Sequence, residues 1–166
     1  MSPTRLAPRA PALAVDVSAD GIRLPIARAR IAEIARDVLH GEGVRDALLS
    51  IAFVSRARIA AMNREHLGHR GATDVISFGF QRVNREAPVV GDVYICPEVA
   101  RVRARENGVG VREELTRLVV HGVLHVLGHD HPEEDGRESS PMWEKQEGIV
   151  RRLLAPPRRG RGSRSR

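Results

Sequence analysis

Four of the chain's seven histidines fall within eleven residues, from His121 to His131. His121 and His125 are four residues apart, so on a helix their side chains would share one face, about 6 Å apart along the axis. Two imidazoles in this arrangement can occupy two adjacent corners of a tetrahedral metal site, with bonds of about 2.0–2.1 Å each. The spacing therefore predicts a metal centre on a helix.

The third ligand has to be either His129 or His131. On a continuous helix His129 would lie about 12 Å along the axis from His121, which is too far to reach the same ion. Gly128 predicts that the helix ends here, because glycine readily adopts the left-handed conformation that terminates helices. A chain that doubles back after this glycine can return His131 to the helix face. We therefore expect His121, His125 and His131 to bind one Zn²⁺ per chain.

The pattern H-x-x-x-H-x-x-G-x-x-H has the spacing of the metzincin zinc signature, but Gly122 stands where a metallopeptidase has its general-base glutamate. Three protein ligands leave the fourth position of a tetrahedral site open, which is typical of catalytic rather than structural zinc. Asp130 is either an acceptor that fixes the tautomer of a ligand imidazole or an ordinary loop carboxylate. The motif therefore predicts a metal cage without the peptidase base.

Length and composition predict one globular domain. The chain has 166 residues, of which 42% are hydrophobic, and this suffices for a substantial core. No run approaches the roughly eighteen apolar residues of a membrane helix, and the N-terminus lacks the apolar segment of a secretory signal. The single cysteine, Cys96, allows no internal disulfide. We therefore expect a cytoplasmic protein that does not interact with a membrane.

The positive charge is concentrated at one end of the chain. The formal net charge is +6, and residues 156–166 contain five arginines and no acidic residue, so the rest of the chain is close to neutral. We expect residues 1–11 to be a disordered N-terminal segment, residues 12–154 to form the catalytic domain and residues 155–166 to be a disordered basic tail. With only 3% aromatic residues, any nucleic acid would be held by arginines and backbone groups rather than by stacking.

The hydrophobic pattern predicts an α+β domain with a small mixed sheet, packed with several helices, and the metal site at the C-terminal end of a central helix. Pro25 is expected to open the first helix at its favoured first-turn position. The short polar segment 81–88 predicts that the strands on either side of it are neighbours in the sheet. We expect strands at 12–17, 47–54, 74–80 and 89–96, and helices at 25–41, 55–67, 98–106, 111–127 and 140–154.

Three strings in the chain resemble the YbeY family, the bacterial rRNA maturation factors described as metal-dependent endoribonucleases. The most specific is His121-Gly-Val-Leu-His-Val-Leu-Gly-His-Asp-His131, and the others are Asn63 with Thr73-Asp74-Val75-Ile76-Ser77-Phe78, and Gly91-Asp92-Val93-Tyr94-Ile95. The resemblance spans about residues 51–150. It implies that His121, His125 and His131 bind zinc. It also implies an endoribonuclease that acts on precursor rRNA, in 3′-end processing of small-subunit rRNA and in ribosome quality control, with the small subunit and its assembly proteins as partners.

The chain departs from the family at one place. Many members have an arginine four residues after the asparagine that matches Asn63, and here that position is Leu67. Arg64 or Arg70 would then have to supply a positive charge to the cleft. We take Arg70 and Asp130 as the candidate catalytic residues.

Several alternatives remain open at this stage. A metallopeptidase-like hydrolase is opposed by Gly122. A non-catalytic, zinc-containing ribosome-assembly factor would need a fourth protein ligand, from His129 or Asp130. His66 and His69 are either a second metal site or two solvent-facing histidines, and Gly79 marks either a bend in a strand or a close approach of the backbone to a ligand. The oligomeric state does not follow from these patterns.

Overall fold

The structure is a computed structural model that describes residues 12–133 and 135–156. The expected disorder of residues 1–11, and of most of the tail, therefore concerns residues outside the described ranges. The elements in chain order are β1 (Leu13–Ser18), α1 (Arg28–Gly41), β2 (Ala47–Phe53), α2 (Arg56–Leu67), β3 (Val75–Phe80), β4 (Val89–Ile95), α3 (Pro97–Glu106), α4 (Val111–Val126), the 3₁₀ helix η1 (Arg137–Ser139) and α5 (Pro141–Leu154).

The predicted α+β domain with a small mixed sheet is confirmed. Its four strands lie in the order β1-β2-β4-β3. β2 pairs in parallel with both β1 and β4, whereas β3 and β4 are antiparallel, with Ser77 opposite Val93. The predicted pairing of the third and fourth strands is therefore also confirmed. The long connections through helices supply the parallel pairs, and the short segment between β3 and β4 supplies the antiparallel pair.

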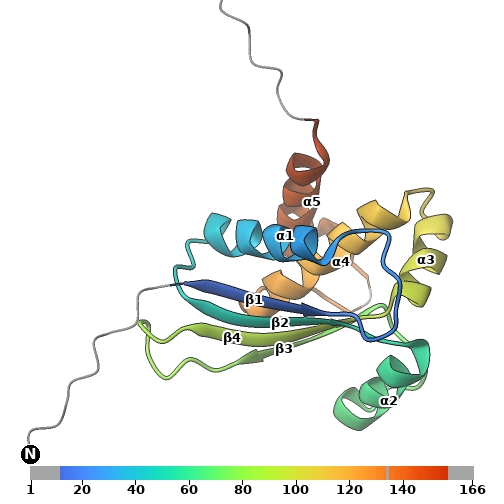
Figure 1. The fold of residues 1–166 in the computed structure, drawn as a ribbon, viewed down its shortest axis with the longest axis horizontal. Coiled ribbons are helices and arrows are strands. Elements are labelled where there is room, and N and C mark those ends of the chain that lie inside the picture. The colour runs from blue at the N-terminus through green and yellow to red at the C-terminus, as the bar shows by residue number, and fades with distance from the viewer. Residues whose placement is uncertain (1–11, 134, 157–166) are drawn as a thin grey trace, which may run out of the picture.

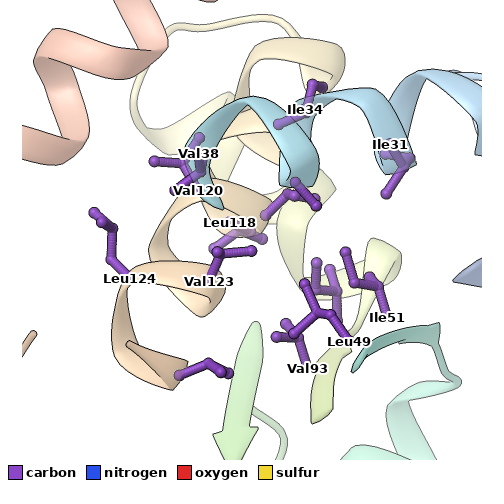
Figure 2. Packing of buried hydrophobic residues seen from close by; sticks show 14 of the residues in the cluster. Ile31, Ile34, Val38, Leu49, Ile51, Val93, Leu118, Val120, Val123 and Leu124 are labelled. Atoms are coloured by element: carbon purple, nitrogen blue, oxygen red, sulfur yellow. The ribbon is translucent and has the colours of Figure 1, made fainter. Parts of the chain in front are cut away.

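Helices α1 and α4 lie side by side on one face of the sheet, α1 against β1 and α4 against β3 and β4, and α5 packs on α4 (Figure 1). Figure 2 shows side chains of α1, such as Ile31 and Ile34, together with Leu118 and Val123 of α4 and Leu49, Ile51 and Val93 of the sheet. The apolar pattern of α4 is more extensive than one stripe, because Val120, Leu124 and Val126 are also buried. His121 is only 5% exposed and so lies within the core rather than at its edge.

Two glycines let α4 pack unusually close to the sheet. A Cβ atom on Gly122 of α4 would lie 2.5 Å from the Cγ1 atom of Val93 in β4, and one on Gly79 of β3 would lie 2.7 Å from the carbonyl oxygen of Val126. Both distances are shorter than real Cβ contacts. Gly79 thus lets α4 approach the sheet closely.

Helix α2 matches its prediction at both ends. The hydroxyl of Ser55 caps it by accepting a hydrogen bond from the Arg58 amide at 3.2 Å, and Gly68 ends it with a left-handed φ of 67°. Its buried residues Ile59 and Met62 pack with Ile76 of β3 in a second apolar cluster. Helix α2 therefore packs against β3 through this second apolar cluster.

The predicted start of the first helix is wrong by three residues. Helix α1 begins at Arg28 after Ala27, and Pro25 lies before it in a bend. The carbonyl oxygen of Pro25 accepts a hydrogen bond from Nε of Arg112 in α4 at 2.7 Å. The fixed φ of proline suits a bend as well as a helical first turn, so its position alone did not locate the helix start. Within residues 12–133 and 135–156, no helix is long and apolar enough to cross a membrane.

Candidate metal centre

The three predicted ligand histidines lie together. The ring centres of His121 and His125 on α4 are 4.5 Å apart, and the ring of His131 lies 5.2 and 5.0 Å from them. One ligand nitrogen from each residue lies within 4.8 Å of the others. The Nε2 atoms of His125 and His131 are 3.2 Å apart, close to the edge of about 3.3–3.4 Å in a tetrahedron built from zinc–nitrogen bonds of about 2.0–2.1 Å. These three histidines could hold one metal ion.

The chain returns to the helix face as the glycine predicted. α4 ends at Val126, and Gly128 has a left-handed φ of 92°. The His129 amide then donates to the Leu124 carbonyl at 3.0 Å, which satisfies one of the free carbonyls of the helix end. The carboxylate of Asp130 accepts a hydrogen bond from the His131 amide at 2.8 Å. This turn brings His131 beside the two helical histidines.

His129 lies outside the group. Its Nε2 atom is 2.8 Å from a carboxylate oxygen of Glu42, and Lys145 contacts the other oxygen of Glu42 at 2.7 Å. The imidazole is therefore engaged at the end of α1. This contact argues against His129 as a fourth ligand, and leaves one side of the three-histidine group open.

Hydrogen bonds fix the tautomers of two of the three imidazoles. The side-chain NH₂ of Gln146 donates to Glu147 at 3.1 Å, so its oxygen faces Nδ1 of His121 at 2.7 Å. Nδ1 of His131 lies 2.8 Å from the carbonyl oxygen of Pro132. Because both partners are acceptors, each Nδ1 carries the proton and each Nε2 has a free lone pair. This is the arrangement that metal ligation through Nε2 requires.

Of the two expectations for Asp130, an acceptor for a ligand imidazole and a loop carboxylate, the hydrogen bonds favour the second. That carboxylate bonds to the main-chain amide of His131, and the imidazole of His131 is oriented by the Pro132 carbonyl instead. An aspartate one residue before a histidine can reach its backbone more readily than its ring. Asp130 thus shapes the loop, and its carboxylate lines the cleft beside the histidines.

An ion-pair network holds Gln146 in place. Arg117 of α4 contacts Glu147 of α5 at 2.8 Å, Glu114 at 2.9 Å and Glu113 at 2.9 Å. Burial raises the pKa of Glu147, but the hydrogen bonds from Arg117 and Gln146 and the charges of Arg117 and Arg151 together outweigh it, and the net pKa is lowered. Glu147 therefore stays ionised at neutral pH and remains a pure acceptor for the amide of Gln146.

Burial also controls the protonation of the histidines. It lowers the pKa of His121 to about 4, and the positive charges of His125, Arg137 and His131 act in the same direction. Burial lowers the pKa of His125 too, as does the charge of His131. Both imidazoles are therefore neutral at pH 7, which a metal ligand has to be. A set of three imidazole nitrogens fits zinc.

A cleft of about 500 Å³ lies beside the three histidines. Asp130 lines it, but Arg70 is exposed and is not among the lining residues. The loop that carries Arg70 is tied back by the Asn63 side chain, which donates to the Gly71 carbonyl at 3.0 Å. The cleft is lined by Asn63, Leu67, His69, Thr73, Asp74, Val75, Ile76, Ser77, His121, His125, Asp130, His131, Glu133 and Arg137.

His66 and His69 do not form a second metal group within the described ranges. The ring of His66 meets Phe78 edge-on, with centres 5.4 Å apart. His69 lines the cleft, but in the described ranges only His121, His125 and His131 form a group of three or more potential ligands. The interpretation of His66 and His69 as a second metal site has no support in this geometry.

Sequence reasoning missed two residues at the site. Gln146 is 2% exposed and lies on the buried face of α5 with Met142, Ile149 and Val150. A glutamine on an otherwise apolar helix face was the signal that could have found it, because a buried amide needs a partner. Arg137 lines the cleft, and no spacing pattern in the sequence indicated this.

Fold and site together define a small α+β protein in which three clustered histidines that could hold a metal ion lie beside a cleft, an arrangement typical of metal-dependent hydrolases. Residues 18–154 match the family model described as "Endoribonuclease YbeY". The chain belongs to the YbeY family, a family of endoribonucleases.

Relatives and a solved structure agree with this assignment. The chain is 38% identical over 125 residues to Endoribonuclease YbeY of Pelotomaculum thermopropionicum, covering 72% of this chain and 81% of that protein. It is 40% identical over 139 residues to Endoribonuclease YbeY of an Anaeromyxobacter species, covering 84% and 71%. The solution structure of TM1509 from Thermotoga maritima matches with a TM-score of 0.56 and 26% identity, covering 84% of this chain and 88% of that one.

Proposed function

We propose that this chain is a zinc-dependent, single-strand-specific endoribonuclease that acts in 3′-end processing of small-subunit rRNA and in ribosome quality control. The observation that carries the proposal is the group of three histidines with two Nε2 atoms freed by Gln146 and Pro132, at the side of an open cleft. The endoribonuclease names of the relatives support RNA as the substrate. The small ribosomal subunit and its assembly proteins are the proposed partners, in the cytoplasm.

Each side chain has a proposed part in the reaction. His121, His125 and His131 would hold the zinc, and Gln146 orients the first of them. When bound, zinc would supply a Lewis acid for a phosphoryl oxygen and lower the pKa of water towards about 7. The carboxylate of Asp130, which lines the cleft, is the proposed proton acceptor. Exposed Arg70 is proposed to contact RNA phosphates outside the cleft.

The two alternatives have less support. A peptidase of this spacing needs a carboxylate at the position of Gly122, where the packing of Val93 leaves no room for a side chain. A purely structural zinc needs a fourth protein ligand, yet His129 is bonded to Glu42, and the group of potential ligands among the described residues contains three histidines only. An open hydrolytic site is therefore the better account.

The test is purified full-length protein on precursor rRNA and on single-stranded RNA, with zinc measured in the same samples. We expect slow cleavage that chelation abolishes and added zinc restores. His121→Ala should lose both zinc and cleavage, whereas the control His129→Ala should keep both. A zinc-replete wild type that leaves RNA intact, or that degrades unfolded protein substrates, would contradict the proposal.

A further inference from the structure

Arg137 carries the one buried, unpartnered polar side-chain atom in the part of the chain that the structure describes. That atom, the Nε of its guanidinium group, makes no hydrogen bond there. Arg137 lines the cleft beside the histidines and also a smaller cavity behind His121, where Gln146 and Trp143 are neighbours. A guanidinium group has five N–H donors and no acceptor. The protein therefore does not use the full donor capacity of this guanidinium group, which also lines the cleft.

The backbone holds Arg137 firmly at this position. Gly136 precedes it with a left-handed φ of 93°, and the carbonyl oxygen of Arg137 accepts hydrogen bonds from the Ser140 hydroxyl at 2.7 Å and the Ser140 amide at 3.1 Å. The same hydroxyl caps α5 by accepting from the Trp143 amide at 3.2 Å. Helix α5 thus positions both Arg137, through its N-cap, and Gln146, which orients His121.

The charge of Arg137 reaches the histidines and is not neutralised by an ion pair. It contributes to the lowered pKa of both His121 and His125, after the larger effect of burial. Among the described residues, no carboxylate forms a salt bridge with Arg137, in contrast to the half-buried Arg117 with its three glutamates. An unpaired cation at the side of a metal site creates a local preference for an anion.

We propose that the guanidinium of Arg137 binds the phosphate group of RNA that enters the cleft beside the three histidines. This inference rests on the proposed function and names the residue that positions the substrate there. Arginine suits the role because its planar fork can donate two parallel hydrogen bonds to one phosphate. Leu67, which also lines the cleft, offers no charge, and Arg70 does not line it. Arg137 is thus the arginine available to the reacting phosphate within the cleft.

The test compares Arg137→Gln and Arg137→Lys with the control Arg45→Gln in the full-length protein. Arg45 is exposed and lies two residues before β2. The N-terminal end of β2 pairs with Val89, at the opposite end of β4 from the Ile95–Val75 pair beside the cleft. Zinc content and melting temperature are measured first. Single-turnover cleavage of single-stranded RNA by zinc-loaded protein follows. Binding of a fluorescent single-stranded RNA dodecamer to chelator-treated protein, between low and high KCl, gives a readout that does not depend on catalysis.

We expect Arg137→Gln to keep its zinc and to cleave about 100-fold more slowly, the usual effect of removing one donor that stabilises developing charge. Its slope of log affinity against log salt should fall by about 0.7, the loss of one phosphate contact to a single strand. Arg137→Lys should restore the slope but only part of the rate, because an ammonium group cannot form the paired hydrogen bonds. Arg45→Gln should match the wild type in both measurements.

Two results would overturn the inference. One is a wild-type rate and salt slope in Arg137→Gln. The other is loss of zinc in parallel with loss of cleavage in both Arg137 variants, which would mean that the guanidinium supports the histidines and not the substrate. If the wild type itself does not cleave RNA, the proposed function fails, but the difference in salt slope between Arg137→Gln and Arg45→Gln still decides whether Arg137 binds phosphate.

Discussion

The side-chain oxygen of Gln146 lies 2.7 Å from Nδ1 of His121, and this contact joins α5 to the metal-binding helix α4. The amide cannot turn around without losing its hydrogen bond to Glu147, which Arg117 in turn holds. The orientation of the most buried histidine therefore depends on a residue 25 positions away in sequence.

Replacing Gln146 should weaken zinc binding without removing it. Partners that orient a ligand imidazole typically contribute 10- to 100-fold in metal affinity, so we expect a loss of about this size for Gln146→Met. Competition with a chromophoric chelator measures it. Glu144→Gln, an exposed change in the first turn of the same helix, is the control and should have wild-type affinity. Equal affinities for both variants would show that the contact does not tune the site.

The three clustered histidines should each be necessary for zinc, and His129 should not be. We expect His121→Ala, His125→Ala and His131→Ala to lose the single zinc, whereas His129→Ala keeps it because its ring bonds to Glu42. Metal analysis after dialysis against a weak chelator measures the retained zinc. Zinc loss from His129→Ala as complete as that from His131→Ala would mean that the third ligand is wrongly assigned.

Gly122→Ala should destabilise the protein, although alanine favours helices. The new methyl group would meet Val93 at 2.5 Å in the core, and overpacking of this kind costs about 1–3 kcal/mol. Gly148→Ala in α5 is the matched control, because nothing lies within 4 Å of its Cβ position. That change should stabilise by about 0.5–1 kcal/mol through helix propensity alone. Urea unfolding of both variants measures the change in the free energy of unfolding, which should be negative for Gly122→Ala and positive for Gly148→Ala. A stabilised Gly122→Ala would contradict the close packing of α4.

The metal-free protein should lose stability as pH falls below about 6.5. His121 has a pKa of about 4 when folded, against 6.5 for an ordinary histidine. Between these values the unfolded chain binds more protons, so acid favours unfolding, by up to about 3 kcal/mol from this residue. Well above pH 6.5 the His121 side chain is neutral in both the folded and the unfolded chain, so it adds no pH dependence to the free energy of unfolding. Urea unfolding of chelated wild type and His121→Asn should diverge in this window, and parallel curves would contradict the assignment.

Deleting residues 156–166 should leave the fold and the zinc intact and reduce only RNA affinity. The segment contains five arginines and no periodic apolar residues. If all five contact single-stranded RNA, the salt slope should fall by up to about 3.5, at roughly 0.7 per phosphate. Binding to a labelled RNA across a salt series measures the slope, with circular dichroism and zinc content as controls. An unchanged slope would show that the tail does not bind RNA.

The sequence by itself determined the elements and the histidine group, because these depend on short-range patterns. The spacing of His121 and His125, with Gly128 after them, follows from helix geometry and from the left-handed conformation of glycine, and local physics carries this through to His131. The caps at Ser55 and Ser140 are equally local. The predicted start of the first helix at Pro25 was wrong. The carbonyl oxygen of Pro25 instead accepts a hydrogen bond from Arg112, a residue 87 positions away that no local pattern indicates.

Only the tertiary structure decided what surrounds the histidines. The contacts of His121 with Gln146, of Gly122 with Val93 and of His129 with Glu42 join elements distant in the chain, and no periodicity encodes which side chains meet. Nor does the sequence show which arginine places its charge at the site. Arg70 and Arg137 both lie outside the predicted helices and strands, but the structure leaves Arg70 exposed and places Arg137 in the lining of the cleft. Spacing specifies a ligand set, but burial and packing between α4, α5 and the sheet select the tautomer, the protonation state and the arginine that faces the cleft.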